Sequence, residues 1–196
     1  MANIVVCMPT MGSIDTRTVE SLFRLRKGEN KVAILTTEYS LIYMARENLV
    51  KKALENPETD YVLFIDSDIV FEPDTMLKLL KDAERGDGIY TAAYAYKDGS
   101  KGIVGRDSNN DPIILDNIKD RRLLIETKLV GLGMALISRN VLVKMSEEFA
   151  ELFHPFSHSG EDYSFCMRAK ECGYKAYIDL DICCGHVGKK VYEVGE

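Results

Sequence analysis

Two aspartates separated by one serine are the first residues of this chain whose types and spacing suggest chemistry. Asp66 and Asp68 directly follow an apolar run, residues 61–65, and precede another, residues 69–71. Side chains two positions apart in an extended segment point the same way, so the pair offers hard oxygen ligands to a divalent cation. Solvated carboxylates that cap a turn would have the same spacing. The apolar residues on both sides favour the cation site.

The same string also fits the nucleophile motif of haloacid-dehalogenase-type phosphatases. In those enzymes the first aspartate attacks phosphorus and the second acts as acid and base, roles that Asp66 and Asp68 could take. That fold carries the motif on its first strand and needs a later pair of acids four residues apart. Here two expected strands and two helices precede Asp66, and Cys166 stands four residues after Asp162. The phosphatase is therefore kept only as an alternative.

A second pair of acids, Glu161 and Asp162, begins an expected helix just after Gly160. Carboxylates in a first turn are stabilised by the helix dipole, so capping alone would explain them. Either could instead serve as a general base, which must be ionised and within hydrogen-bond distance of an acceptor hydroxyl. The charge pattern leaves both interpretations open.

The five cysteines, and His186 among the three histidines, supply softer ligand types. The cysteines are Cys7, Cys166, Cys172, Cys183 and Cys184. Their odd number and the lack of C-x-x-C spacing indicate neither a disulfide framework nor a zinc ribbon. His186, two residues after the Cys183-Cys184 pair, could complete a thiolate metal site with Cys166 or Cys172. Small buried cysteines and a structural histidine are the alternative.

Several basic residues and glycines could bind a phosphate group. Arg46 lies on an expected helix and could bring a guanidinium to a phosphate, while Lys189 and Lys190 could neutralise a diphosphate. Gly131 and Gly133 lack the third glycine of the dinucleotide fingerprint, and no P-loop sequence is present. Phosphates would therefore have to be held by a metal and by separate cations.

Apolar runs and helical spacing define the elements that must position these residues. Strands are expected at residues 4–8, 32–35, 61–65, 89–95, 123–130, 134–137 and 176–178, and helices at 16–26, 41–56, 73–86, 139–145 and 161–172. The strict alternation over residues 1–96 predicts a doubly wound, mostly parallel sheet with helices on both faces. Turn signals after Tyr96 predict a smaller, irregular β region over residues 97–196. We expect one α/β domain over residues 1–196.

The composition limits the partners and the location. The chain has 196 residues, 31 acidic against 25 basic ones, and a net charge of -6. That length supports one sizeable core and excludes a disordered chain. The acidic balance argues against nucleic acid, whose binding needs a broad basic surface. No apolar run approaches the roughly 20 residues of a membrane span, and the N-terminal residues show no signal-peptide pattern, so we expect a cytoplasmic protein.

Taken together, the order and spacing of these motifs resemble the GT-A-fold glycosyltransferases, particularly small family-2-like enzymes. The segments that carry the resemblance are Pro9-Thr10-Met11-Gly12, Ala45-Arg46-Glu47-Asn48, Asp66-Ser67-Asp68, Gly131-Leu132-Gly133, Gly160-Glu161-Asp162 and Cys184-Gly185-His186-Val187-Gly188. The resemblance covers about residues 3–190. It implies the GT-A version of the Rossmann-like fold, with the nucleotide-sugar half ending near residue 96 and the acceptor side following it.

The resemblance implies a binding site for a nucleotide-diphosphate sugar. Its base and ribose would lie against Pro9, Thr10 and Met11, and its phosphates would be approached by Arg46. Gly131 and Gly133 would let the backbone come close to the donor sugar. Ser67 and Lys189 complete the set of residues expected to contact the donor.

The resemblance also implies a metal ion and a base. Asp68 and His186 would bind the cation directly, and Asp66 would contact the ribose or reach the metal through water. A nitrogen ligand beside oxygen ligands favours Mn²⁺ over Ca²⁺, with Mg²⁺ as the other candidate. Asp162 matches the catalytic base of inverting members, and Glu161 would help to position the acceptor.

We therefore expect a metal-dependent glycosyltransferase that moves a hexose-type sugar from the donor to a glycan or another hydroxyl acceptor, with inversion. A non-catalytic sugar-nucleotide or glycan-binding module is the alternative from another functional class, and the phosphatase is a third. The short second half of the chain also favours a homodimer.

Overall fold

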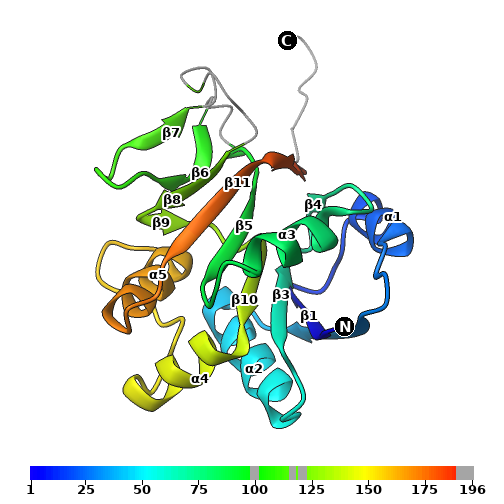
Figure 1. Ribbon diagram of the computed structural model, residues 1–196, viewed down its shortest axis with the longest axis horizontal. Coiled ribbons are helices and arrows are strands. Elements are labelled where there is room, and N and C mark those ends of the chain that lie inside the picture. Colours follow the sequence, from blue (N-terminus) through cyan, green and yellow to red (C-terminus); the bar gives the residue numbers. More distant parts are fainter. Residues whose placement is uncertain (98–101, 115–117, 119–122, 189–196) are drawn as a thin grey trace.

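The computed structural model describes residues 1–97, 102–114, 118 and 123–188. In this part of the chain, seven strands form the central sheet (Figure 1). In spatial order they are β2 (Lys31–Glu38), β1 (Asn3–Thr10), β3 (Tyr61–Ile65), β10 (Met134–Ser138), β5 (Ile89–Ala93), β11 (Ala176–Cys183) and β8 (Leu124–Thr127). Only β10 and β8 run against the other five strands. The sheet is therefore mostly parallel, as expected.

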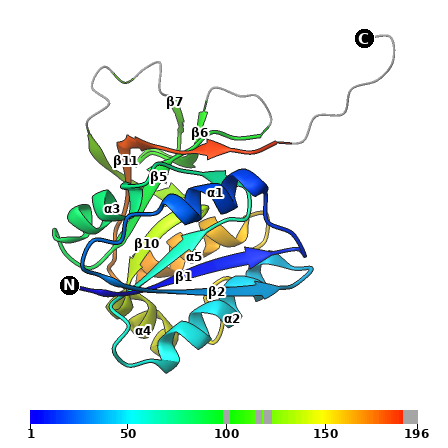
Figure 2. The same cartoon turned by 90° about the vertical axis from the view of Figure 1, so that its right-hand side faces the viewer.

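Helices cover both faces of this sheet. Within the described residues they are α1 (Thr16–Arg24), α2 (Ile42–Glu55), α3 (Thr75–Ala83), α4 (Arg139–Glu148) and α5 (Glu161–Glu171). Apolar side chains of α2, α4 and α5 pack on one face, and those of α1 and α3 pack on the other (Figure 2). Because both faces are covered, β1 and β3 bury nearly every residue. This explains why their sequences are continuously apolar and do not alternate.

Two small sheets complete the described part of the fold. One contains β7 (Pro112–Ile114), β6 (Gly102–Arg106) and β9 (Leu129–Val130), and the other pairs β12 (Gly185–His186) with β4 (Ile69–Val70). The β12–β4 pair sets His186 opposite Ile69, the residue after Asp68. The backbone N–H of Val187 donates to the carbonyl of Asp68 at 2.8 Å. A segment from the end of the chain is thereby held beside the two aspartates.

The fourth strand, β5, is parallel to β3 as expected, but β10 lies between them and runs antiparallel to both. The turn before β10 lies at the carboxyl end of β3, where the N–H of Asp66 donates to the carbonyl of Gly133 at 2.9 Å. The expected strand 123–130 is divided at Lys128: β8 pairs with β11, whereas β9 pairs with β6.

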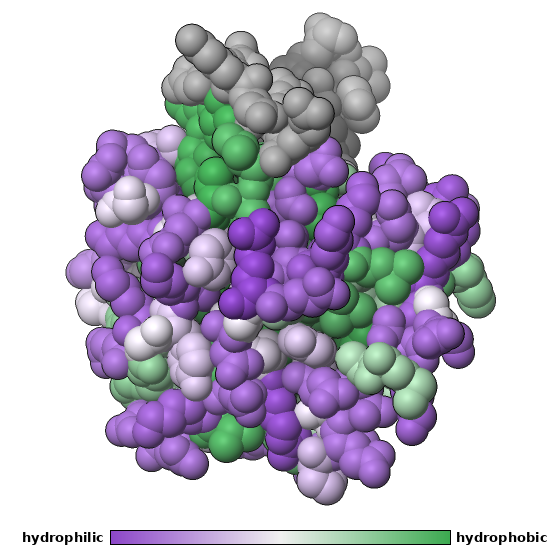
Figure 3. Space-filling view, in the orientation of Figure 1, coloured by the Kyte–Doolittle hydropathy of each residue, from purple (hydrophilic) through white to green (hydrophobic). Residues whose placement is uncertain are grey.

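The surface is mainly hydrophilic on the face shown in Figure 3, where a group of hydrophobic residues lies over β6 and β7. Large apolar side chains exposed elsewhere include Met11, Phe23, Ile34 and Leu41. None of the helices in the described part of the chain combines the length and the apolar character that a membrane span needs.

Candidate functional site

Three carboxylates from distant parts of the chain surround one arginine at the carboxyl edge of the central sheet. Asp66 follows β3, whereas Glu161 and Asp162 begin α5. Nη2 of Arg46, on α2, lies 3.0 Å from Oδ1 of Asp66 and 3.4 Å from Oδ1 of Asp162. Its Nε lies 3.7 Å from Oε1 of Glu161. The structure thus brings Asp66, one member of the first acid pair, together with both members of the second.

Arg46 is almost completely buried, with 1% of its side chain exposed, and its guanidinium carbon lies 5.0 Å from the ring centre of Phe64. The surrounding negative charges offset the cost of burying this cation. The contact predicted between the Arg46 guanidinium and the donor phosphates stays a prediction. Within the described residues, Nη1 of Arg46 and Oδ1 of Asp162 make no hydrogen bond, so the cluster can accept a further polar partner.

Asp162 has the properties of a general base. Burial raises its pKa to about 7; Arg46 opposes this rise, whereas the charges of Glu161 and Asp66 add to it. The backbone N–H of Leu132 donates to Oδ2 of Asp162 at 3.0 Å and fixes the carboxylate. The side chain of Asp162 is 21% exposed, while its Oδ1 atom is buried and makes no hydrogen bond within the described residues. A carboxylate that titrates near neutrality can both take and release a proton.

Asp68 and His186 form a second group beside this cluster. Nδ1 of His186 lies 2.8 Å from the carbonyl oxygen of Ala95. Because a carbonyl can only accept, Nδ1 carries the hydrogen of this bond. Nε2 lies 3.5 Å from Oδ1 of Asp68. A metal-binding histidine usually donates its other ring N–H to a carbonyl or a carboxylate, as Nδ1 of His186 does here to Ala95.

The ligand types at this pair fit a divalent cation that is only partly coordinated by protein. Within residues 1–97, 102–114, 118 and 123–188, no three His, Cys, Asp or Glu side chains converge as a metal site. A cation held by Asp68 and His186 would therefore take its other ligands from the bound substrate and water, as expected where phosphates complete the coordination. Asp66 contacts Arg46. Its expected contact with the metal or the ribose stays a prediction.

A hollow of about 470 Å³ opens beside Asp68. Ser67 and Asp68 line it, together with Ser13, Ile14, Lys97 and Val187. The ammonium of Lys97 bonds to Oδ2 of Asp68. Sequence reasoning did not identify Lys97, because a single lysine after a strand looks like any surface lysine.

The three residues predicted for the nucleotide base lie at the end of β1, on the same edge of the sheet. Thr10 is buried and its hydroxyl donates to the carbonyl of Thr37 at 3.3 Å, while Met11 is 73% exposed. Pro9, Thr10 and Met11 are not among the residues that line the hollow beside Asp68. Lys189, predicted to contact the donor, lies outside the described residues.

Tyr94 is a further residue of this site that the sequence did not reveal. Its hydroxyl accepts a hydrogen bond from the N–H of Gly133 at 2.9 Å, and its ring meets His186 edge to face at 5.3 Å. A Cβ at Gly131 would lie 2.1 Å from the Tyr94 hydroxyl oxygen. Packing against Tyr94 therefore explains why a glycine stands at position 131. The predicted approach of Gly131 to the donor sugar stays a prediction. Tyr94 was overlooked because it continues an apolar strand.

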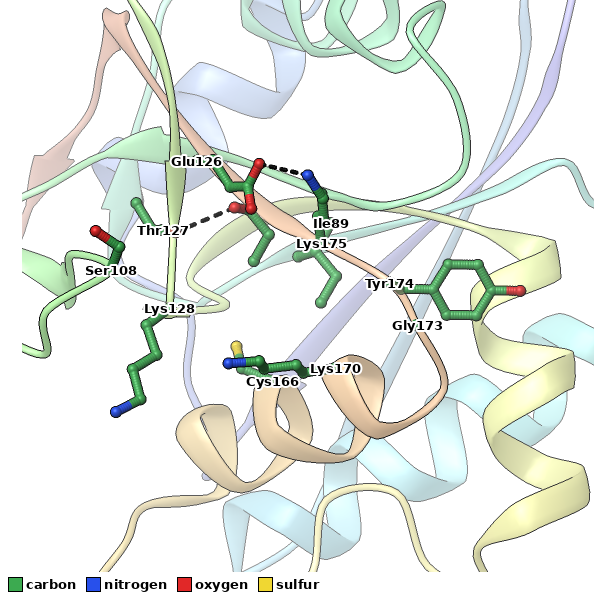
Figure 4. Close-up of a pocket in the computed structure, with 11 residues that line it drawn as sticks. Ile89, Ser108, Glu126, Thr127, Lys128, Cys166, Lys170, Gly173, Tyr174 and Lys175 are labelled. Carbon is green, nitrogen blue, oxygen red and sulfur yellow. Dashed lines mark hydrogen bonds and ion pairs between the residues drawn. The ribbon is translucent and has the colours of Figure 1, made fainter.

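A second hollow, of about 430 Å³, lies toward the other end of α5 (Figure 4). Its rim carries Lys128, Lys170 and Lys175, with Nζ of Lys175 2.8 Å from Oε2 of Glu126, and Cys166 lies at its base. None of the residues predicted for the donor, the metal or the base lines it. The thiolate site considered from the sequence does not form in the described part of the chain, where all five cysteines are free.

Comparisons with known proteins agree with this geometry. The model of the family Glycosyl transferase family 2 matches residues 12–145. No curated protein matches the chain. The crystal structure of A197 from STIV is 21% identical, covers 96% of this chain and 87% of its own, and superposes with a TM-score of 0.70. GalNAc-T7, solved with UDP, GalNAc and Mn²⁺, is 10% identical, and the match covers 100% of this chain but 44% of that one, with a TM-score of 0.67.

These matches confirm the GT-A fold expected from the motifs and give the phosphatase alternative no support. The structural neighbours are too distant in sequence to transfer a substrate. The family match, however, spans more than half of the sequence and includes Arg46, Asp66 and Asp68. The chain therefore belongs to glycosyl transferase family 2.

Proposed function

We propose that this protein transfers a sugar from a nucleotide-diphosphate sugar to a hydroxyl group of a glycan or another acceptor, with inversion at the anomeric carbon. The observation that carries the proposal is the position of Asp162. A carboxylate with a pKa of about 7 lies in the same buried cluster as Asp66, whose chain neighbour Asp68 faces His186. A base and a pair of metal-ligand types thus occupy one edge of the sheet.

The donor side of the proposal rests on the hollow beside Asp68 and on the chemistry of its lining. Asp68 and His186 would hold Mn²⁺ or Mg²⁺, which would neutralise the charge of the departing nucleoside diphosphate. GalNAc-T7, which shares the fold, was solved with UDP and Mn²⁺. Pro9, Thr10 and Met11 remain the residues proposed for the base and ribose.

On the acceptor side, Asp162 accepts the proton of the attacking hydroxyl. The acceptor oxygen forms a bond to the anomeric carbon while the bond from that carbon to the diphosphate oxygen breaks. Arg46 keeps Asp162 and Asp66 at fixed positions, and Glu161 helps to orient the acceptor. Gly131 and Gly133 would border the donor sugar.

The remaining parts of the proposal come from the sequence. Residues 1–96 would bind the nucleotide sugar, residues 97–196 would supply the acceptor side, and Lys189 would contact the donor. Mn²⁺ is proposed ahead of Mg²⁺ because His186 supplies nitrogen. A cytoplasmic location and a homodimer also remain predictions.

The test is Asp162→Asn, assayed against a panel of nucleotide sugars with Mn²⁺. We expect transfer to fall roughly 10²–10⁴-fold while donor binding is retained, because the amide cannot take the proton. Asp74→Asn is the matched control and should be unaffected, because Asp74 pairs with Lys78 at the start of α3, which packs on the other face of the sheet from α5. Full transfer by Asp162→Asn would reject the base. Donor binding without turnover of any sugar by the unmodified protein would favour the non-catalytic module.

A further inference from the structure

Lys97 places a positive charge on the carboxylate that is proposed to bind the metal. Its ammonium bonds to Oδ2 of Asp68, while Oδ1 of the same carboxylate lies 3.5 Å from Nε2 of His186. Lys97 and Asp68 both line the hollow of about 470 Å³. The two oxygens of Asp68 thus face different partners.

Lys97 is the most exposed member of this group. Its side chain is 40% exposed and that of Asp68 is 31% exposed, whereas the side chain of His186 is 17% exposed and bonded to the carbonyl of Ala95. A lysine side chain has several rotatable bonds, so its ammonium could contact a ligand in the hollow.

The charges at this site determine how the two ligands would affect each other's binding. A divalent cation between Asp68 and His186 would meet a carboxylate whose charge Lys97 already neutralises, and it would stand close to a second cation. A diphosphate in the same hollow would replace this repulsion with attraction, because its anionic oxygens can contact both the divalent cation and the Lys97 ammonium.

We propose that Lys97 makes uptake of the divalent cation depend on the anionic donor: its ammonium weakens binding of the cation alone and binds the diphosphate once both are present. This inference rests on the proposed function. Since coupling between two ligands is reciprocal, the cation must strengthen diphosphate binding by the same factor. Loss of the Lys97 charge should reduce that factor, whether it is measured on binding of the cation or on binding of the diphosphate.

The experiment is calorimetry on the full chain, with Mn²⁺ alone and with UDP, GDP, ADP or CDP in the presence and absence of Mn²⁺. In Lys97→Gln we expect Mn²⁺ alone to bind roughly 10-fold more tightly and the diphosphate with Mn²⁺ to bind roughly 10-fold more weakly, within the usual range of coupling. Lys97→Arg should retain most of the coupling. Lys128→Gln, at the hollow of Figure 4, is the matched control and should bind like the unmodified chain.

The outcomes separate this inference from the proposed function. If the unmodified chain binds Mn²⁺ and a diphosphate but Lys97→Gln gives the same affinities, the role of Lys97 is overturned and the proposed function stands. Tighter Mn²⁺ binding with unchanged diphosphate affinity also overturns it, because the phosphate contact would be missing. No uptake of Mn²⁺ by the unmodified chain, with or without a diphosphate, overturns both.

Discussion

At the scale of single residues, one buried guanidinium forms ion pairs with three acids. Arg46 contacts Asp66, Glu161 and Asp162 and is itself 1% exposed. Removing one partner of a buried ion pair leaves an uncompensated charge, which typically costs about 3–5 kcal/mol. Arg46 is therefore best described as a positioning residue for Asp162. Its contribution to the site is the separation and ionisation of the carboxylates around it.

The raised pKa of Asp162 predicts the pH dependence of transfer. A general base works only when ionised, so kcat/KM should rise with pH through about 7 and level off above it. Glu161→Gln removes a neighbouring negative charge that raises the pKa of Asp162, so the rise should move to lower pH. The measurement is kcat/KM between pH 5.5 and 9 for both proteins. A profile that is flat over this range, or one that moves to higher pH in Glu161→Gln, would contradict the assignment.

At the scale of elements, short connections hold the site together. The turn between β9 and β10 gives Asp162 its N–H donor at Leu132 and contacts the Tyr94 hydroxyl through Gly133. The two-residue strands β4 and β12 hold His186 beside Asp68. Such elements have too few residues to form alone, so they depend on the packed sheet beneath them. Changes in these turns should affect stability and the site together.

Gly131 provides a test at this scale. In Gly131→Ala the new Cβ would lie 2.1 Å from the Tyr94 hydroxyl oxygen and 2.6 Å from Cγ1 of Val104, so we expect about 1–3 kcal/mol of destabilisation from overpacking. The measurement is the free energy of unfolding in urea. Gly188→Ala, whose Cβ would meet nothing within 4 Å, is the control and should change little.

A double variant makes the Gly131 test specific. Tyr94→Phe removes the oxygen that the new Cβ would meet, so Gly131→Ala should cost less in that background than in the unmodified chain. Coupling of this kind is expected for residues in contact. Simple additivity of the two substitutions would show that Tyr94 is not the cause.

At the scale of the whole molecule, an acidic protein is proposed to bind an anion. The chain has a net charge of -6, so a nucleotide sugar cannot be held by a broad basic surface. Cations close to the site must therefore make the local electrostatic potential positive. Lys97 and a divalent cation at Asp68 and His186 would do so at one edge of the sheet.

Ligand binding should therefore stabilise the whole fold only when both components are present. With Mn²⁺ present throughout and a nucleoside diphosphate added at about 100 times its apparent dissociation constant, the expected gain over Mn²⁺ alone is about 2.7 kcal/mol. For a chain of this size that corresponds to a rise in Tm of about 5–10 °C. Differential scanning calorimetry with and without chelator measures it. Asp68→Ala and His186→Ala should each lose the rise, and a rise that survives in both, or in chelator, would reject the metal site.

Features that depend on residues close in the chain were determined by the sequence alone. Apolar runs predicted β1 and β3, helical spacing predicted α2 and α5, and the acids after these elements identified Asp66 and Asp162 as candidates. Both patterns are local, because the periods of strands and helices and the positions of their ends are set within a few residues. The motif order was also enough to indicate the family and its fold.

Only the tertiary structure decided the features that join distant parts of the chain. It inserted β10 between β3 and β5, buried Arg46 against acids 20 and 116 positions away, and set Tyr94 and Lys97 beside the predicted residues. Residues so far apart leave no periodic trace in one sequence, since the same local pattern is compatible with several strand orders. Burial and charge pairing in the packed sheet select one of them, and that selection brought Asp66 together with Glu161 and Asp162 around Arg46.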